Sequence, residues 1–471
     1  MGIMNKGDEA VGTKSKFMAS AEWMRENLGE GFCLAKWKQV SLHLPTGLNN
    51  SCYHPPLHHI DPAPLKDNPG ALHNTEHKKQ QRVIMLRNER PSECQYCWNI
   101  EDTGNLSDRH YRSGEPWAAD DYEAIRASTG AEDWIPSYVE VNFNHACNLA
   151  CSYCSPQFSS SWQAEVDKWG AWPTSTPHNA PEHFQGRNRP IPHSQENPYV
   201  DAFWEWWPQL YPRLKHFRMT GGEPLMDRNT YRVFDYVLAL PNPELHLNVT
   251  SNFSVELKLF EKYLDYVKRL CGTQIEHFMQ YVSLDTGEPQ HAEYIRHGLN
   301  FRRMWDYVHR YLDEIPYRNS LTFIITMNNL SVLGIQRQLE WILDLRRMYS
   351  KTYQRVWFDT PLLRQPRWQS LQILPPVYAD RLERVADWME LNMERPEDPF
   401  HGFKDYEVQR MRRDIAWMRE GQKLDHDYIV AQRADFYRFF NEHDKRRSTD
   451  FERTFPEMRE FWQECRYHAQ R

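Results

Sequence analysis

The 471-residue chain lacks any long hydrophobic run and carries no large excess of charge of either sign. A membrane-spanning helix needs about 20 consecutive, mostly apolar residues, and no such stretch occurs, so we expect no membrane span. The net charge of −7 gives no general basic field and hence no nucleic-acid signal. Internal repeats and low-complexity tracts are also missing. These absences predict a soluble globular protein with about two to four domains, at roughly 100–200 residues per domain.

The first twenty residues are polar and lack the apolar core that a secretory signal contains. We therefore expect a cytoplasmic protein in a reducing compartment. Its nine cysteines are then better explained as metal ligands or core residues than as disulfide partners. Two of them, Cys271 and Cys465, stand alone in the sequence, and we expect these two to be structural.

The middle of the chain contains strand-like and helix-like segments in alternation. Residues 138–143 (YVEVNF) alternate and include β-branched side chains, which is typical of a strand. Further strands are expected at 214–220, 245–251, 280–285, 321–327 and 355–361, and helices at 199–210, 228–240, 254–270, 301–314 and 332–349. Strands that alternate with helices predict an α/β fold with a parallel sheet or barrel.

The flanking segments differ in composition and suggest the domain boundaries. We expect a mobile tail and a short helix, at about 21–27, within residues 1–31. A loop-rich domain should occupy 32–130, and the α/β domain should occupy 135–374 with a long loop at 170–200. Residues 375–471 have a helical pattern with charges of mixed sign, and we expect them to pack as helices with solvated faces.

Three cysteines stand close together directly after the first predicted strand. Cys147 is followed by three residues and Cys151, and then by two residues and Cys154. Three thiolates on one loop can ligate three irons of a cubane cluster and leave the fourth iron without a protein ligand. The alternatives are buried thiols, or a zinc site that takes His145 as its fourth ligand.

A glycine-rich motif, Gly221-Gly222-Glu223-Pro224, follows the next predicted strand. The two glycines let the backbone approach a ligand closely, and Glu223 offers a carboxylate to the ammonium group of a ligand. Such a motif alone is usually just a turn. In company with the cysteine loop, in which Tyr153 is placed to lie over an adenine, it indicates a ligand site.

Over roughly residues 138–365 these motifs resemble the radical SAM superfamily. Weaker similarities follow in order at 250–252 (TSN), 283–285 (SLD) and 294–298 (YIRHG). The resemblance implies a partial (β/α)6 TIM-like barrel that binds a 4Fe–4S cluster through catalytic Cys147, Cys151 and Cys154. It also implies that S-adenosylmethionine is bound by Tyr153, Gly221, Gly222, Glu223, Pro224, Ser251, Asn252, Ser283 and Arg296. The structural alternatives are a helix cap for Ser251 and a surface ion pair for Arg296.

The reaction that this resemblance implies is the reductive cleavage of S-adenosylmethionine to a 5′-deoxyadenosyl radical, which abstracts hydrogen from a substrate. The sequence leaves open whether that substrate is a peptide or a small molecule. An electron donor such as flavodoxin or ferredoxin is implied as a partner. Asp285 and His297 lie where a proton acceptor would be useful, although Asp285 is better explained as structural or cofactor-binding.

Four more cysteines, Cys33, Cys52, Cys94 and Cys97, precede the expected barrel. Four thiolates in a loop-rich domain make a complete site for a 4Fe–4S cluster or a zinc ion. Spacing alone does not decide between the two, because histidines 54, 58 and 59 lie close to Cys52 and keep zinc in consideration.

The spacing of Cys33, Gly47 and Cys52 is similar to the opening of the SPASM and twitch auxiliary domains, and Cys94-x2-Cys97 is consistent with the shorter, twitch form. This implies a second, fully ligated auxiliary 4Fe–4S cluster that passes electrons. In the best-known members this domain follows the barrel, whereas here it precedes it. That order matches a less characterised group that includes phage proteins, so the compartment would be the host cytoplasm if the source is viral.

A protein of another class remains as the alternative, a non-catalytic binding protein stabilised by zinc or by clusters, whose carboxyl-terminal helices bind a partner. The GGEP motif and Arg296 would have no purpose in such a protein. The long loop is either a lid over the substrate or an insertion. Its aromatic, histidine and arginine residues are Trp172, His178, His183, Arg187 and Arg189.

Overall fold

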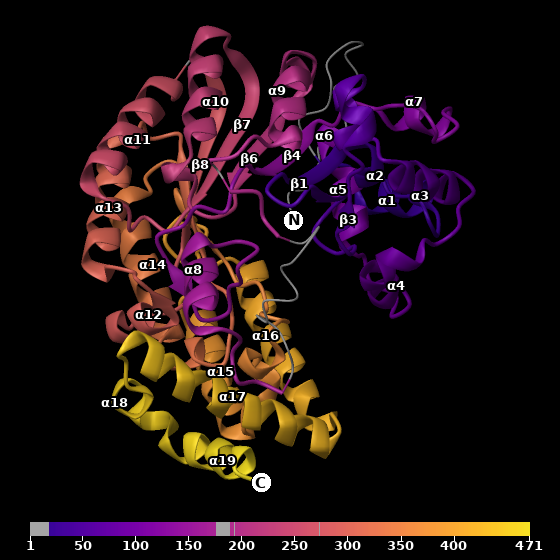
Figure 1. The fold of residues 1–471 in the computed structure, drawn as a ribbon. Coiled ribbons are helices and arrows are strands. Elements are labelled where there is room, and N and C mark those ends of the chain that lie inside the picture. The colour runs from indigo at the N-terminus through magenta and orange to yellow at the C-terminus, as the bar shows by residue number, and fades with distance from the viewer. Residues whose placement is uncertain (1–17, 176–188, 193, 273) are drawn as a thin grey trace. The chain divides into compact units, whose positions relative to one another are not determined.

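The computed structural model describes residues 18–175, 189–192, 194–272 and 274–471. The chain forms two compact units, each built from two separate segments (Figure 1). The amino-terminal unit combines Met1–Val141 with Asn197–Phe217, and the carboxyl-terminal unit combines Asn142–Glu196 with Arg218–Arg471. In the part of the chain described, no helix is long and apolar enough to cross a membrane.

This division differs from the domains that composition predicts. The amino-terminal unit continues past the expected boundary at 130–135, and it takes in Asn197–Phe217 from the expected α/β domain. The helical region after residue 375 does not form a unit of its own, because it belongs to the same unit as the parallel strands. Most of the tail that we expected to be mobile lies outside the described residues.

The amino-terminal unit contains more regular structure than its loop-like composition predicts. Its strands β1, β2 and β3 pair in antiparallel fashion. They span Gln39–His43, Leu48–Asn50 and His58–His59. Its helices are short: α1 Ala21–Leu28, α2 Ala35–Lys38, α3 Glu76–Leu86, α4 Gln95–Glu101, α5 Asp108–Gly114, α6 Pro116–Ala119, α7 Tyr122–Arg126 and α9 Pro198–Leu210. Helices α1 and α9 are confirmed predictions, while the elements between residues 35 and 126 were not predicted.

Helix α3 shows why the sequence gives so little sign of these elements. It has no regular stripe of apolar residues, and its buried residues are Lys78, Arg82 and Met85. The Lys78 ammonium donates to the Gln39 carbonyl at 2.8 Å, and Arg82 Nε donates to the Lys36 carbonyl at 3.0 Å. A helix face can therefore be charged and buried at once, because backbone carbonyls satisfy its donors, and hydrophobic periodicity does not detect such a face.

The carboxyl-terminal unit contains four parallel strands in the order β7, β8, β10 and β11. They span Asn242–Ser251, Ile275–Ser283, Ser320–Ile324 and Val356–Asp359, and they alternate with α10 Arg228–Ala239, α11 Leu257–Leu270, α13 Phe301–Glu314 and α14 Ile335–Tyr349. The predicted strands and helices of this region are thus confirmed, as is an α/β fold with a mostly parallel sheet. In the pairing register Ser251 lies opposite Val282, and Ile324 lies opposite Ser283. The carboxyl ends of these strands therefore meet at one edge, where parallel sheets commonly hold their sites.

The predicted strands at 138–143 and 214–220 are β4 (Tyr138–Asn142) and β6 (His216–Thr220), both of which end at the border between the two units. All five residues of β4 are buried. The three-cysteine loop follows β4 directly, and the GGEP motif follows β6 directly. Both motifs thus leave the carboxyl end of a strand.

The carboxyl-terminal region is helical, as predicted, and it belongs to the same unit as the parallel strands. Its helices are α15 Pro376–Leu391, α16 Asp405–Glu420, α17 His426–Arg447, α18 Phe451–Thr454 and α19 Arg459–Ala469, coloured yellow to orange in Figure 1. A fully buried ion pair joins Arg346 of α14 to Glu407 of α16 at 2.6 Å. Tyr294 donates a hydrogen bond to Asp444 of α17 at 2.8 Å.

Candidate functional site

Cys147, Cys151 and Cys154 come together on the loop after β4. Cys151 belongs to the short strand β5 (Ala150–Cys151), and the Cys154 amide donates to the Cys151 carbonyl at 3.0 Å, which closes a turn. Burial, followed by the neighbouring Cys151 thiol, raises the pKa of Cys154 to about 12. The same two causes raise the pKa of Cys147 well above its usual value. The Cys151 thiol thus opposes the ionisation of both Cys147 and Cys154, which is the environment that a bound cation relieves.

The amino-terminal end of α8 (Ser160–Trp169) holds this loop in place. Ser161 Oγ donates to the Cys147 carbonyl at 2.7 Å, and Ser160 Oγ accepts a hydrogen bond from the Cys147 amide at 3.1 Å. Trp162 Nε1 donates to the Cys151 carbonyl at 2.7 Å. The sequence analysis did not predict α8, although its Ser-Ser-Ser start is a usual amino-terminal cap.

Arg296 and Tyr153 form a buried network with Asp285 beside the cysteine loop. Cys151 pairs with Arg296 in the ladder between β5 and the short strand β9 (Arg296–His297). Arg296 Nη2 donates to Asp285 at 2.8 Å and to the Tyr153 hydroxyl at 2.6 Å, and Nη1 lies 3.7 Å from the Cys151 sulfur. The ion pair that we considered for Arg296 is therefore present, but it is buried and not on the surface.

Glu223 is buried at the carboxyl end of β6, with its carboxylate fixed by three donors. It accepts hydrogen bonds from the Ser251 hydroxyl at 2.8 Å, the Asn252 amide at 2.8 Å and the Leu225 amide at 3.1 Å. Burial raises the pKa of Glu223 to about 7, despite these three donors. The structure thus brings Glu223, Ser251 and Asn252 together, and Asn252 reaches the cysteine loop through Asn148 at 2.9 Å. Ser283 ends the adjoining strand β8 at the same edge.

The two glycines of the GGEP motif lie directly against the loop after β4. Gly221 has a φ of +122°, and a Cβ on it would approach Asn142 Oδ1 to 2.1 Å. A Cβ on Gly222 would approach the Ala146 carbonyl oxygen to 2.3 Å. The same carbonyl accepts a hydrogen bond from the Glu223 amide at 2.7 Å, so the backbone of the GGEP turn is bonded directly to that of the cysteine loop.

Substituting Gly222→Ala is therefore expected to destabilise the protein by about 1–3 kcal/mol, the usual cost of overpacking a site that cannot relax. The obstacle is backbone, and moving it would displace the residue before Cys147. Thermal and urea unfolding measure the change. Gly70→Ala is the matched control, because its Cβ would come no closer than 3.2 Å to a side-chain oxygen. Equal stability of the two variants would contradict the close approach.

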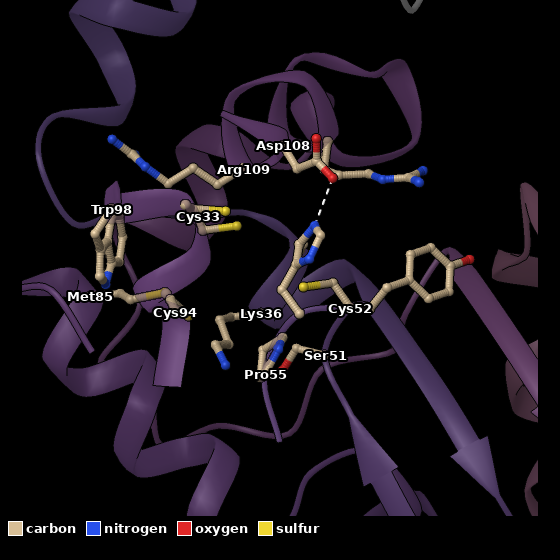
Figure 2. Close-up of a pocket in the computed structure, with 15 residues that line it drawn as sticks. Cys33, Lys36, Ser51, Cys52, Pro55, Met85, Cys94, Trp98, Asp108 and Arg109 are labelled. Carbon is tan, nitrogen blue, oxygen red and sulfur yellow. Dashed lines mark hydrogen bonds and ion pairs between the residues drawn. The ribbon is translucent and has the colours of Figure 1, made fainter. Parts of the chain in front are cut away.

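The other four cysteines line one pocket of the amino-terminal unit (Figure 2). Cys33 precedes α2, Cys52 follows β2, Cys94 ends a 3-10 helix at Ser92–Cys94, and Cys97 lies in α4. Burial raises the pKa of both Cys52 and Cys97 to about 12, and the Cys33 thiol is the next cause in each case. Burial also raises the pKa of Cys94 to about 11. Residues 33–52 and 94–97 thus contribute four thiols to the lining of one pocket.

Cationic side chains line the same pocket. Lys36 is buried and forms an ion pair with Glu93, and its charge lowers the pKa of both Cys52 and Cys94. Arg109 lines the pocket as well and also lowers the pKa of Cys94. Neither cation was a candidate in the sequence analysis, because nothing in the residues around them marks a site.

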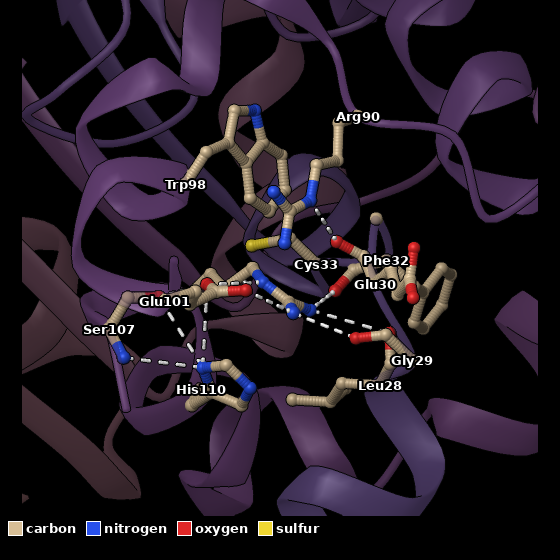
Figure 3. A network of polar contacts seen from close by, with 12 residues as sticks. Leu28, Gly29, Glu30, Phe32, Cys33, Arg90, Trp98, Glu101, Ser107 and His110 are labelled. Carbon is tan, nitrogen blue, oxygen red and sulfur yellow. Dashed lines mark hydrogen bonds and ion pairs between the residues drawn. The ribbon is translucent and has the colours of Figure 1, made fainter. Parts of the chain in front are cut away.

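Arg109 also fixes the backbone just before Cys33, and its partners Gly29, Phe32 and Glu101 are labelled in Figure 3. Its guanidinium forms a buried ion pair with Glu101 at 2.6 Å and donates to the carbonyls of Phe32 at 2.6 Å and Gly29 at 2.8 Å. Ser113 Oγ accepts the Leu34 amide at 3.0 Å. The residues before and after Cys33 are thus both tied to α5.

Two of the three histidines that favour zinc have other partners. His54 lines the pocket, but its Nε2 is bonded to Asp108 at 2.6 Å and its ring stacks on Tyr96. His58 is bonded to Thr75 at 2.9 Å, and burial lowers its pKa to about 3. Within the described ranges, no group of three or more His, Cys, Asp or Glu side chains is arranged to hold a single metal ion.

The long loop at 170–200 is described only in part. Trp172 is buried and stacks on Phe439 of α17 with ring centroids 4.3 Å apart, and Ser175 is bonded to Asp435. Arg189 is exposed. His178, His183 and Arg187 lie outside the described residues, so the choice between a lid and an insertion stays a prediction. Of the two lone cysteines, Cys465 is buried in α19, and Cys271 follows the last residue of α11.

Neither a model of a known protein family nor a curated protein matches the chain. Among solved structures, it is similar to one described as native anSMEcpe with bound AdoMet, at 13% sequence identity and a TM-score of 0.31, over 53% of this chain and 59% of that one. It is also similar to Streptococcus suis SuiB, at 11% identity and a TM-score of 0.35, over 67% of this chain and 62% of that one. The chain thus spans less than two thirds of the length of either protein. Scores this low carry no argument about function.

Proposed function

We propose that this protein is a radical SAM enzyme that carries two 4Fe–4S clusters. The observation that carries the proposal is the juxtaposition of the three-thiol loop with the buried carboxylate of Glu223. The Glu223 amide is bonded to the Ala146 carbonyl at 2.7 Å, one residue before Cys147, and the Glu223 charge is among the causes that raise the pKa of Cys147. A carboxylate and three thiolates at one edge of a parallel sheet match a site-differentiated cluster with a chelated amino acid beside it.

The donor set fits such a cluster. Cys147, Cys151 and Cys154 supply three sulfur ligands, and their mutual repulsion as thiolates is relieved by bound iron. When bound, the cluster supplies the electron that cleaves S-adenosylmethionine to methionine and a 5′-deoxyadenosyl radical. The chain's own part is to position that ligand and to keep water from it.

Glu223 is suited to hold the ammonium group of S-adenosylmethionine. Its carboxylate is oriented by Ser251 and by the Asn252 amide, so little side-chain freedom remains to be lost on binding. In its buried position the pKa of about 7 means that the charged form is costly without a cation. An ammonium partner removes that cost. Tyr153, Gly221, Gly222, Pro224, Ser251, Asn252, Ser283 and Arg296 remain the proposed further contacts.

The second cluster is proposed for the pocket of the amino-terminal unit. Four thiols provide one ligand for each iron, so this site leaves no iron open to substrate. Lys36 and Arg109 place positive charge beside thiolates that would otherwise repel each other in a buried pocket. We therefore propose an auxiliary 4Fe–4S cluster that conducts electrons, in a twitch-like domain placed before the barrel.

The partners follow from this chemistry. The proposed substrate is a peptide or a small molecule with an unactivated C–H bond, and the proposed electron donor is a flavodoxin or ferredoxin. The alternative function is a binding protein stabilised by zinc at both cysteine sets. In that protein Glu223 would be buried beside the cysteine loop with a raised pKa and no ligand to compensate it.

Anaerobic reconstitution of the full chain tests the proposal. We expect about eight irons and about eight acid-labile sulfides per chain, and release of 5′-deoxyadenosine on addition of S-adenosylmethionine and dithionite. Iron and sulfide are measured colorimetrically, zinc by mass spectrometry and the nucleoside by chromatography. About four irons with one retained zinc would remove the electron-conducting cluster from the proposal. Zinc alone, with no stable iron, would overturn the enzyme assignment.

A further inference from the structure

The carboxyl-terminal helices place a buried arginine beside the three-cysteine loop. Arg447 is the last residue of α17, and it is 8% exposed. Its guanidinium lies over the ring of Trp162, at 5.0 Å from the centroid. Trp162 in turn donates its indole hydrogen bond to the Cys151 carbonyl. Arg447 is thus separated from the cysteine loop by a single side chain.

Glu165 forms an ion pair with Arg447. Arg447 Nε and Nη2 both donate to one oxygen of Glu165, at 3.1 and 2.9 Å, and the Glu165 side chain is 12% exposed. Glu165 belongs to α8, the helix whose first turn holds Cys147 and Cys151. The ion pair therefore joins α17 to the element that positions the thiols.

One nitrogen of Arg447 is left over. Nη1 is buried and has no hydrogen-bond partner among the residues that the structure describes. A buried donor without an acceptor is unfavourable, because its hydrogen bond to water is not replaced. Burial raises the pKa of both the Cys151 and the Cys154 thiol, and the positive charge of Arg447 is among the smaller effects that lower it.

We propose that Arg447 is a positioning residue that raises the reduction potential of the cluster held by Cys147, Cys151 and Cys154, with Glu165 acting in the opposite direction. This inference rests on the proposed function. Reduction adds one negative charge to a bound cluster, and a buried cation nearby stabilises that charge while a buried anion opposes it. The carboxyl-terminal helices then form part of the cluster's environment, which is a role distinct from docking a partner.

The test is the midpoint potential of the reconstituted full chain, followed by electron paramagnetic resonance. The relevant cluster is identified as the one whose signal changes when S-adenosylmethionine is added. We expect Arg447→Gln to shift the midpoint potential of this cluster to more negative values by at least about 28 mV. For a one-electron couple, at 59 mV per tenfold, this is about a threefold change in the equilibrium constant of reduction. Glu165→Gln should shift the midpoint to more positive values. The double variant should return close to wild type, and Arg447→Lys should lie between wild type and Arg447→Gln.

Arg446→Gln is the matched control, because Arg446 precedes Arg447 and lies over Trp172 but is bonded to Glu442 and to loop carbonyls. Its midpoint should stay at the wild-type value. Shifts of the same sign in Arg447→Gln and Glu165→Gln, or no shift in either, would overturn this inference alone. If Arg447→Gln does not fold, the positive shift of Glu165→Gln decides. A wild-type protein that binds no iron would overturn the proposed function and this inference with it.

Discussion

Replacing Cys147, Cys151 and Cys154 together by alanine is expected to abolish 5′-deoxyadenosine formation and to remove about half of the bound iron. The three thiols are the proposed ligands of one cluster, and the other four cysteines lie in a separate unit. The iron content should therefore fall from about eight to about four per chain. Formation of 5′-deoxyadenosine should fall by at least about a thousandfold, to the background without enzyme.

A reciprocal pair of substitutions provides the control for this result. Cys33→Ala with Cys94→Ala should also remove about four irons, yet leave the cleavage of S-adenosylmethionine by dithionite-reduced protein in place. Cys271→Ala should change neither quantity, because Cys271 is a lone thiol after α11. Retention of all iron in the triple variant would show that these three thiols do not hold a cluster.

Substituting Glu223→Gln is expected to weaken the binding of S-adenosylmethionine by about a hundredfold, which is about 2.7 kcal/mol and within the range measured for removing one partner of a buried charge pair. The variant keeps the shape of the side chain but loses the charge that pairs with the ammonium. Its amide nitrogen would also meet donors, because all three present partners of Glu223 donate to it. Isothermal titration calorimetry on the reconstituted protein measures the change.

The pH dependence of binding gives a second reading of Glu223. Its pKa of about 7 in the folded protein lies above the usual value of 4.5. In the protein without ligand, Glu223 therefore contributes stability at pH values below the pKa that it has in the unfolded chain. That contribution is lost as the pH rises through about 7. Burial favours the protonated form of Glu223, whereas a bound ammonium group favours its charged carboxylate. We expect affinity to weaken as the pH falls through about 7, with proton release on binding near that pH.

Asp414→Asn is the matched control for Glu223→Gln. Asp414 is also a buried carboxyl of the carboxyl-terminal unit whose pKa is raised by burial, to about 6, and it is bonded to the hydroxyl of Thr360. Its substitution should leave both the affinity and its pH dependence unchanged. An unaltered pH dependence in Glu223→Gln would remove Glu223 from the ammonium site.

The sequence was most informative where structure and chemistry are local. The strands and helices between residues 214 and 361 repeat with periods of two and about 3.6, and the structure has them within a few residues of the predicted bounds. The three-cysteine loop and the GGEP motif are each contiguous, and together they indicated a site. Their contact was also predictable, because both follow parallel strands and the carboxyl ends of such strands share an edge.

The amino-terminal unit could not be derived in the same way. Its strands and most of its helices are shorter than the window in which a period becomes visible, and α3 buries Lys78 and Arg82. The Gln39 and Lys36 carbonyls accept from these two side chains, which also bond to His73 and Asn74. The two carbonyls belong to a segment that is distant in sequence, so no local pattern around Lys78 or Arg82 predicts them.

The sequence by itself thus determined the parallel α/β region, the two sets of cysteines and the carboxylate that follows a glycine pair. Only the tertiary structure decided which other charges surround those thiols. Lys36 and Arg109 line the pocket of the amino-terminal set, and Arg447 lies over Trp162, which is bonded to the Cys151 carbonyl in the other set. A buried charge is stabilised by the groups that the fold brings within a few ångströms of it, and the residues adjacent to it in sequence do not indicate which groups those are.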